Sequence, residues 1–270
     1  MDRPSWVPSG VDVTRASVAR VYDYYLGGSH NFASDRAFAD EVLQVYPELT
    51  SICRDNRDYL RRAVLYLSAR GIDQFLDLGS GIPTAGNVHE IAQAVNPLTR
   101  VVYVDHDPVA VTHSRELLNG NDRAMVMLDD LREPGRVLRD AVVLGGLDLT
   151  RPVAVLLVSV LHFVGDEHGP AELVAEYMAA TAPGSYVVLS HARSDGQRDA
   201  AASEQVYGRS RSPNPMRFRS RAEIEALFGD LTVIDPGVVH LPQWRPELGE
   251  DADPAVGEDY PALAGAGRRD

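Results

Sequence analysis

A short apolar segment that runs into a glycine-rich turn is the strongest candidate for a ligand site in this sequence. Residues 75–78 contain a single carboxylate, Asp77, and Gly79, Ser80 and Gly81 follow. Glycines let the backbone approach a ligand closely and adopt dihedral angles closed to other residues. The helix that should follow favours an anionic group at its start, such as a carboxylate. Asp77, just before the turn, suits an ammonium group and would repel a diphosphate.

The turn departs from the dinucleotide-binding fingerprint. That fingerprint places a third glycine three positions after the second, where this sequence has Thr84, preceded by Pro83. The missing third glycine therefore argues against a nucleotide-dependent oxidoreductase.

A second carboxylate, Asp105, follows the apolar residues 101–104. Its spacing from the glycine turn is close to the roughly 20 residues expected for a residue that binds both ribose hydroxyls. The alternative is a helix cap, but Asp107 before Pro108 fits that role better.

A third carboxylate, Asp130, comes after the apolar residues 124–128 and before Leu131. It could accept a hydrogen bond from the exocyclic amine of an adenine. An exposed acidic turn would look the same in the sequence, so both interpretations stay open.

The histidines offer one candidate base. His162 follows the expected fourth strand, where a general base with a pKa near neutrality would be useful. A buried histidine satisfied by hydrogen bonds is the alternative. His106 is expected to face solvent or an adenine edge, and the histidine spacing matches no metal site.

The residues near the N-terminus suggest a cap. Gly27 and Gly28 permit a tight turn, and Asn31 and the neighbouring tyrosines, among them Tyr22 and Tyr24, carry polar tips on apolar bodies. Such a segment could close over a cofactor and an acceptor, exclude water and align the reacting atoms. A purely structural helix–turn is the alternative.

The elements that position these residues follow from hydrophobic periodicity. Residues 17–70 are mostly helical in pattern, and after Gly71 short apolar runs alternate with helical stretches, which indicates a mostly parallel sheet with helices on both faces. Strands are expected at 74–78, 100–104, 124–128, 153–158, 185–190, 231–234 and 260–266, and helices at 84–95, 108–118, 171–181 and 220–228. Ligands of such sheets bind at the carboxyl ends of the strands.

Composition excludes several classes of protein. The net charge of −13 leaves no extended basic face for nucleic acid, and hydrophobic residues make up 44% of the chain. One cysteine permits no internal disulfide. No apolar run reaches the roughly 20 residues of a membrane span, and no signal peptide is recognisable, so a cytoplasmic protein is expected.

These motifs together resemble the class I S-adenosylmethionine-dependent methyltransferases, and in particular an actinobacterial S-adenosyl methyltransferase family first described as a domain of unknown function. The likeness covers roughly residues 17–268 and includes Pro83, which is usual in that family. It rests on residues 19–28, 31–32, 35–36, 56–57, 61–63, 74–77, 81–84, 103–105, 160–163, 183–186 and 243–246. Ser29 and His30 depart from the family pattern.

The resemblance implies a Rossmann-like α/β fold with a seven-stranded sheet and a helical N-terminal cap. Residues 1–70 would form the arm and cap, and residues 71–270 the core of the same domain. It also implies S-adenosylmethionine as cofactor, and an enzyme acting on a small-molecule acceptor is expected. A regulatory module that binds S-adenosylmethionine without turnover is the alternative.

The predicted site residues fall into three groups. Cofactor contacts are expected at Asp77, Gly79, Ser80, Gly81, Pro83, Thr84, Asp105, His106, Asp130, Leu131 and Ser159. Acceptor or cap contacts are expected at Tyr24, Gly27, Gly28, Asn31, Phe32 and Arg36. His162 and Tyr22 are the candidate catalytic residues, and no metal is expected.

Overall fold

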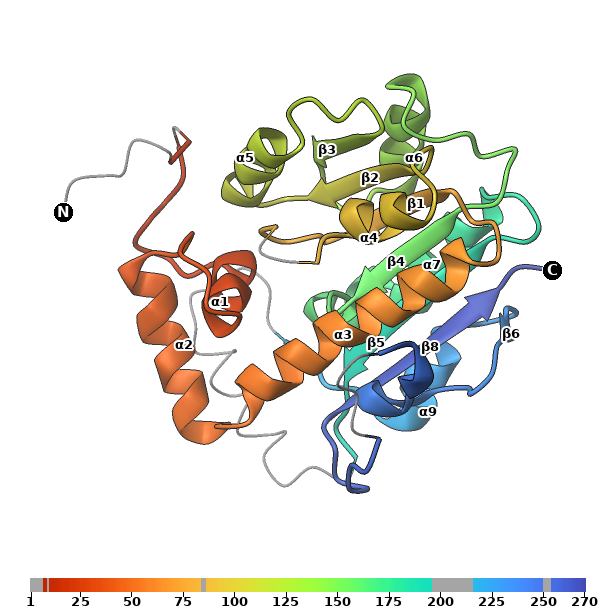
Figure 1. The fold of residues 1–270 in the computed structure, drawn as a ribbon. Coiled ribbons are helices and arrows are strands. Elements are labelled where there is room, and N and C mark those ends of the chain that lie inside the picture. Colours follow the sequence, from red (N-terminus) through yellow and green to blue (C-terminus); the bar gives the residue numbers. More distant parts are fainter. Residues whose placement is uncertain (1–6, 9, 84–85, 196–215, 250–253) are drawn as a thin grey trace.

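The chain folds around one twisted sheet with helices on both faces (Figure 1). The computed structural model describes residues 7–8, 10–83, 86–195, 216–249 and 254–270. The strand order is β3-β2-β1-β4-β5-β8-β6, with β7 also paired to β8. β1 to β5 run parallel, whereas β8 is antiparallel to β5, β6 and β7.

The predicted strands are present, with one addition. The described strands are β1 (Gln74–Leu78), β2 (Arg100–Asp105), β3 (Ala124–Leu128), β4 (Ala154–Val158), β5 (Tyr186–Ala192), β6 (Thr232–Val233), β7 (Val239–His240) and β8 (Ala262–Arg268). The two-residue β7 was not predicted, because so short a segment has no readable alternation.

The helices agree with the prediction less closely. They are α1 (Val18–Tyr25), α2 (Ala33–Val45), α3 (Leu49–Ser68), α4 (Val88–Val95), α5 (Pro108–Leu117), α6 (Pro134–Val143), α7 (Pro170–Ala179) and α9 (Arg221–Ala226). α4 begins four residues later than predicted, since Asn87 and Glu90 form a capping box there. The sequence prediction missed α6.

Two apolar layers cover the sheet. Residues of α3 and α4 pack with Phe75 and Val101 on one face, and residues of α6, α7 and α9 pack with Leu76 and Val102 on the other. Adjacent strand residues thus point to opposite layers. The carboxyl ends of β1, β2 and β4 are left at one edge of the sheet.

Trp244 anchors the C-terminal part of the chain. Its side chain is fully buried and lies edge-on to Tyr59 and Tyr66, while its carbonyl accepts a hydrogen bond from Arg62 Nε at 2.8 Å. Trp244 therefore holds the segment after β7 against α3.

The helices α1 and α2 stand beside the carboxyl edge of the sheet (Figure 1). Buried ion pairs connect them to it. Arg20 Nε donates to Asp35 Oδ2 at 2.8 Å, and Arg20 Nη1 donates to Asp107 Oδ2 at 3.2 Å. Asp107 also caps α5, as predicted, by accepting the N–H of Val109. We call Arg20, Asp35 and Asp107 the cap latch.

Within the described residues, no helix combines the length and apolarity required to cross a bilayer.

Candidate functional site

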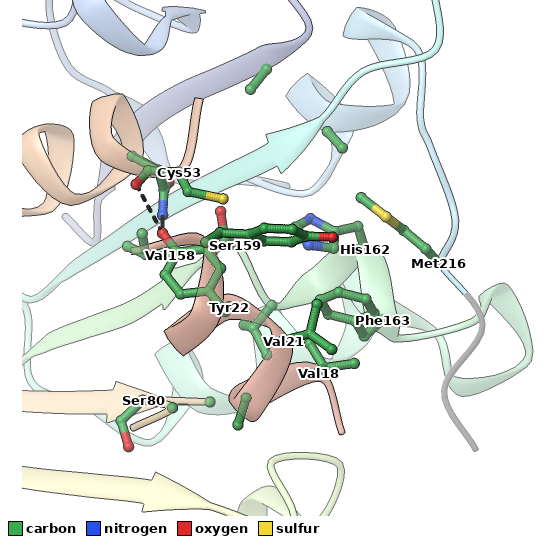
Figure 2. A pocket seen from close by; sticks show the side chains of 18 of the residues that line it. Val18, Val21, Tyr22, Cys53, Ser80, Val158, Ser159, His162, Phe163 and Met216 are labelled. Atoms are coloured by element: carbon green, nitrogen blue, oxygen red, sulfur yellow. Dashed lines mark hydrogen bonds between the residues drawn. The ribbon is translucent and has the colours of Figure 1, made fainter. Parts of the chain in front are cut away.

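The main cavity opens where the strands β1, β2 and β4 end, between the sheet and the helices α1, α2 and α3 (Figure 2). It lies at the carboxyl edge predicted from the parallel pattern. The predicted residues that line it are Asp77, Gly79, Ser80, Gly81, Asp105, His106, Asp130, Leu131, Ser159, His162 and Tyr22. Pro83 lines two neighbouring cavities, and Thr84 falls outside the described residues.

Asp105 organises the glycine turn. Its Oδ2 accepts the N–H of Gly81 at 2.7 Å, and its Oδ1 accepts the N–H of Asp107 at 2.8 Å. Each oxygen keeps a further lone pair, so the carboxylate can still accept two hydroxyl groups. Burial raises the pKa of Asp105.

Asp77 is a buried carboxyl group that faces the same cavity. Burial raises its pKa to about 7, against the opposing effect of the nearby Arg57 charge. A carboxyl group held in this way is stabilised as a carboxylate by any cation that enters beside it.

The two glycines of the turn have different neighbours. Both have positive φ, +72° at Gly79 and +66° at Gly81. A Cβ on Gly79 would lie 2.3 Å from Cγ2 of Val160, whereas a Cβ on Gly81 would meet nothing within 4 Å. Gly81 therefore leaves open space that a ligand can occupy.

We expect Gly79→Ala to lower the free energy of unfolding by about 2–3 kcal/mol, because a backbone penalty of roughly 1–2 kcal/mol adds to the clash with Val160. Gly81→Ala should lose only the backbone part, about 1–2 kcal/mol. Urea unfolding of both variants checks this difference. Val160→Ala in the Gly79→Ala background should recover part of the loss, and equal losses for the two glycine variants would contradict the assignment.

The end of β3 carries an ion pair. Arg132 contacts both oxygens of Asp130, with Nε at 3.0 Å from each. Burial acts to raise the pKa of Asp130, but the bonds to Arg132 lower it overall. Leu131 is buried, and its carbonyl accepts the Tyr177 hydroxyl at 2.7 Å. Asp130 lines the cavity, as an adenine contact would, but its carboxylate is already paired with Arg132. The structure therefore fits neither the adenine contact nor the exposed acidic turn completely.

The segment after β4 contains one strained backbone position and a buried histidine. Ser159 has a φ of +54°, a conformation that costs a non-glycine residue about 1–3 kcal/mol and clusters at functional sites. His162 is 5% exposed, and its Nδ1 is buried with no hydrogen-bond partner among the described residues. Burial lowers the pKa of His162 well below its usual value, which keeps the ring neutral at pH 7.

Tyr22 belongs to a chain of hydrogen bonds. Its hydroxyl donates to the carbonyl of Cys53 at 3.1 Å and accepts Nδ2 of Asn56 at 3.0 Å (Figure 2). Asn56 Oδ1 in turn accepts the hydroxyl of Ser190 at 2.6 Å. Burial raises the pKa of Tyr22, so the phenol stays protonated and its position is fixed.

The predicted acceptor contacts in the cap lie elsewhere. The Tyr24 hydroxyl bonds to the exposed Asp40, and Phe32 packs with Ile82 and Val109 on the core. Asn31 and the exposed Arg36 bond to each other.

Gly27 and Gly28 line a second cavity beside Arg54 and Arg61. In the described structure, these six cap residues shape the cap rather than line the main cavity. Sequence spacing cannot show which face of a short helix will meet a cavity.

The sequence prediction missed two kinds of cavity residue. Arg57 of α3 lines the cavity beside Asp77. Val18, Val21, Phe163 and Met216 form apolar wall. The signal for Arg57 was its place in the family motif at residues 56–57, to which no role was given.

Among the described residues, no group of three or more His, Cys, Asp or Glu side chains is arranged to hold a metal ion.

The strand order and the position of the cavity are those of the class I S-adenosylmethionine-dependent methyltransferase fold. A family model for S-adenosyl methyltransferases matches residues 4–270. The chain therefore belongs to the S-adenosyl methyltransferase family, and its cofactor is S-adenosylmethionine.

Two solved structures are similar over almost the whole chain. A protein from Thermobifida fusca YX with a provisional methyltransferase assignment is 39% identical, with a TM-score of 0.91 over 98% of this chain and 99% of that chain. A DUF574 family protein from Streptomyces avermitilis MA-4680 is 36% identical, with a TM-score of 0.89 over 96% and 99%.

A more distant structure shares the fold alone. The 1,6-didemethyltoxoflavin-N1-methyltransferase of Burkholderia thailandensis, solved with 1,6-didemethyltoxoflavin and S-adenosylhomocysteine, is 16% identical, with a TM-score of 0.50 over 99% of each chain. Comparison with curated proteins gives no match.

Proposed function

We propose that this protein transfers a methyl group from S-adenosylmethionine to a small-molecule acceptor held under the helices α1 and α2. The observation that carries this proposal is a single cavity that joins the carboxylates Asp77 and Asp105 to the neutral His162 and an apolar wall. A site that only bound the cofactor would not need the neutral His162 and the apolar wall.

The residues present fit the cofactor. Asp105 would accept the two ribose hydroxyls, and Asp77 would hold the ammonium group of the methionine part. Gly81 leaves the open space that the ligand would fill. Leu131, Asp130 and His106 would surround the adenine, which leaves the carboxylate of the methionine part to be placed.

Arg57 is the residue we assign to that carboxylate. It lines the cavity, its charge opposes the raised pKa of Asp77, and its Nη2 donates to the carbonyl of Gly86 at 2.9 Å, which orients the guanidinium. An arginine and a carboxylate side by side match the two charged groups of an amino acid.

We expect Arg57→Gln to weaken S-adenosylmethionine binding about 10- to 100-fold, since a hydrogen bond to a charged group contributes about 1.5–3 kcal/mol. Binding of 5′-methylthioadenosine, which lacks the amino and carboxylate groups, should be nearly unchanged. Arg54→Gln is the matched control, because Arg54 is exposed on the same helix and does not line this cavity. Equal weakening of both ligands would reject the assignment.

The raised pKa of Asp77 predicts a pH dependence of binding. With a pKa of about 7, the side chain is mostly protonated at pH 6, and a proton then competes with the ligand's ammonium group. Affinity for S-adenosylhomocysteine should therefore fall as pH falls below 7, by up to about tenfold per unit. Calorimetry between pH 5.5 and 7.5 measures the slope.

Two controls isolate Asp77. 5′-Methylthioadenosine keeps the ribose that Asp105 binds but lacks the ammonium group. The pKa of Asp105 is also raised, so the affinity of this ligand should fall with pH less steeply than that of S-adenosylhomocysteine, and the difference between the two slopes belongs to Asp77. Asp77→Asn should also flatten the profile for S-adenosylhomocysteine. A slope that survives undiminished in Asp77→Asn would assign the titration to another group.

The protein's own residues would bind, orient and exclude water in this reaction. When bound, S-adenosylmethionine supplies an electrophilic methyl group. The apolar wall keeps water from the reacting atoms, and His162 is placed to accept the proton that leaves the acceptor. Tyr22, locked by Cys53 and Asn56, would act as a positioning residue.

Turnover separates this proposal from its alternative, a module that binds the cofactor without reaction. The protein is incubated with methyl-deuterated S-adenosylmethionine and a small-molecule extract of a cell that carries it, and mass spectrometry follows labelled products. We expect a product that carries the labelled methyl group and forms only when the protein is present. S-adenosylhomocysteine should form in an equal amount. Tight cofactor binding without any such product across extracts would favour the module.

Three further features belong to this proposal. Residues 1–70 and 71–270 would work as one domain, with α1 and α2 as the cap. The acceptor would be a small molecule rather than nucleic acid or membrane lipid, in keeping with the net charge of −13. The reaction would take place in the cytoplasm.

A further inference from the structure

The cavity divides into two parts with different chemistry. The charged residues that line it among the described residues are Arg57, Asp77, Asp105, Asp130 and Arg132, and all lie where the cofactor would bind. Much of the remaining wall comes from α1, α2, α3 and the segments around η1 (Leu161–Phe163) and residue 216. We call this second part the acceptor chamber.

The acceptor chamber is apolar and rich in rings. Val21, Tyr25 and Cys53 are each at most 5% exposed, and Tyr22, Phe163 and Met216 also line the chamber (Figure 2). Aromatic and thioether side chains make favourable contacts with a flat ring. Such a wall offers little to a sugar or another polyol, whose hydroxyls would lose their water without new partners.

Three titratable groups of the chamber, His162, Tyr22 and Cys53, are shifted toward their neutral forms. Burial lowers the pKa of His162 and raises the pKa of Tyr22 and of the Cys53 thiol. A charged acceptor would meet the same unfavourable environment, because no opposite charge lines this part of the described chain.

A ring nitrogen of His162 offers a hydrogen bond to a nucleophile in the chamber. His162 Nδ1 is buried and has no hydrogen-bond partner among the described residues. His191, 5.4 Å away between ring centroids, is by contrast held at both nitrogens by Arg219 and the carbonyl of Ala192. Of these two histidines, His162 is therefore the one that keeps a ring nitrogen available for a hydrogen bond.

We propose that the acceptor is an uncharged aromatic molecule whose hydroxyl or amine group hydrogen-bonds to His162. This inference rests on the proposed function. The lone pair of the oxygen or nitrogen forms the new bond to the methyl carbon, the carbon–sulfur bond breaks with its electrons left on sulfur, and the acceptor's proton passes to His162.

The test compares two bicyclic phenols on protein saturated with S-adenosylhomocysteine. The probes are 2-naphthol and 6-hydroxynaphthalene-2-sulfonate, which share the ring and the hydroxyl and differ in charge. Calorimetry should show 2-naphthol binding at least tenfold more tightly than the sulfonate. Phe163→Ala should weaken 2-naphthol at least fivefold and leave S-adenosylhomocysteine unchanged.

A charge placed in the chamber should reverse the preference. Met216→Lys keeps a flexible chain of similar length and adds an ammonium group, so the sulfonate should gain and 2-naphthol should lose affinity. Equal or tighter binding of the sulfonate to wild type, or no binding of 2-naphthol at 1 mM (about −4 kcal/mol) to protein that binds S-adenosylhomocysteine, would overturn the inference. Failure to bind S-adenosylhomocysteine would instead overturn the proposed function on which it rests.

Discussion

Asp105→Asn should weaken S-adenosylmethionine binding by about 100-fold or more. Each hydrogen bond from a ribose hydroxyl to a carboxylate contributes about 1.5–3 kcal/mol, and 100-fold corresponds to about 2.7 kcal/mol. The variant also loses one of the acceptors that hold Gly81 and Asp107, so the turn itself is less well ordered for the ligand. Calorimetric titration measures the dissociation constants of the wild type and the variant.

The same variant should change the stability of the ligand-free protein only slightly. It removes a buried carboxylate whose pKa is already raised, which offsets the lost hydrogen bond. Asp129→Asn is the matched control, because Asp129 is adjacent to the site, pairs with Arg136 and does not line the cavity. If the control weakened binding as much as Asp105→Asn, the ribose assignment would be wrong.

Arg20→Met should lower the free energy of unfolding by about 3–5 kcal/mol, which is the usual cost of removing one partner from a buried ion pair. Arg20 is 4% exposed, and its removal leaves Asp35 and Asp107 buried without their counter-charge. Chemical denaturation measures the loss.

Two further variants show whether the cap latch causes that loss. Arg36→Met removes an exposed arginine of α2 outside the latch and should cost about 1 kcal/mol or less. Arg20→Met combined with Asp35→Asn should recover part of the stability, since one buried charge is removed. A loss in Arg20→Met no larger than in Arg36→Met would show that the latch does not hold the cap.

The sequence was most informative where function depends on adjacent residues. The turn from Gly79 to Gly81 and the carboxylate Asp105 lie directly after apolar strands, so local order alone places them at one edge of a parallel sheet. Capping by Asp107 is local in the same way. These features could be read without knowing how the helices pack.

The cap could not be read in this way. Tyr22 and Tyr24 are two residues apart on α1, yet Tyr22 lines the cavity and Tyr24 bonds to Asp40. That outcome depends on how α1 docks, and the docking is set by Arg20 and residues far along the chain. α6 was missed because Pro134, Gly135 and several charged residues obscure its apolar positions Val137, Leu138 and Ala141.

His162 shows how burial can change an interpretation. The alternative to a general base at His162 was a buried histidine satisfied by hydrogen bonds. His191 fits that description. His162 is equally buried but keeps Nδ1 unsatisfied within the described chain and lines the cavity. The two histidines differ in their hydrogen-bond partners, which their positions in the sequence do not reveal.

The central claim is tested most directly by calorimetric titration of S-adenosylmethionine, S-adenosylhomocysteine and NAD into the wild type and Asp105→Asn. The predicted result is saturable one-to-one binding of the first two ligands to wild type, no competition by NAD, and loss of binding in the variant. Preferential binding of NAD, or undiminished binding of S-adenosylmethionine to Asp105→Asn, would contradict the account.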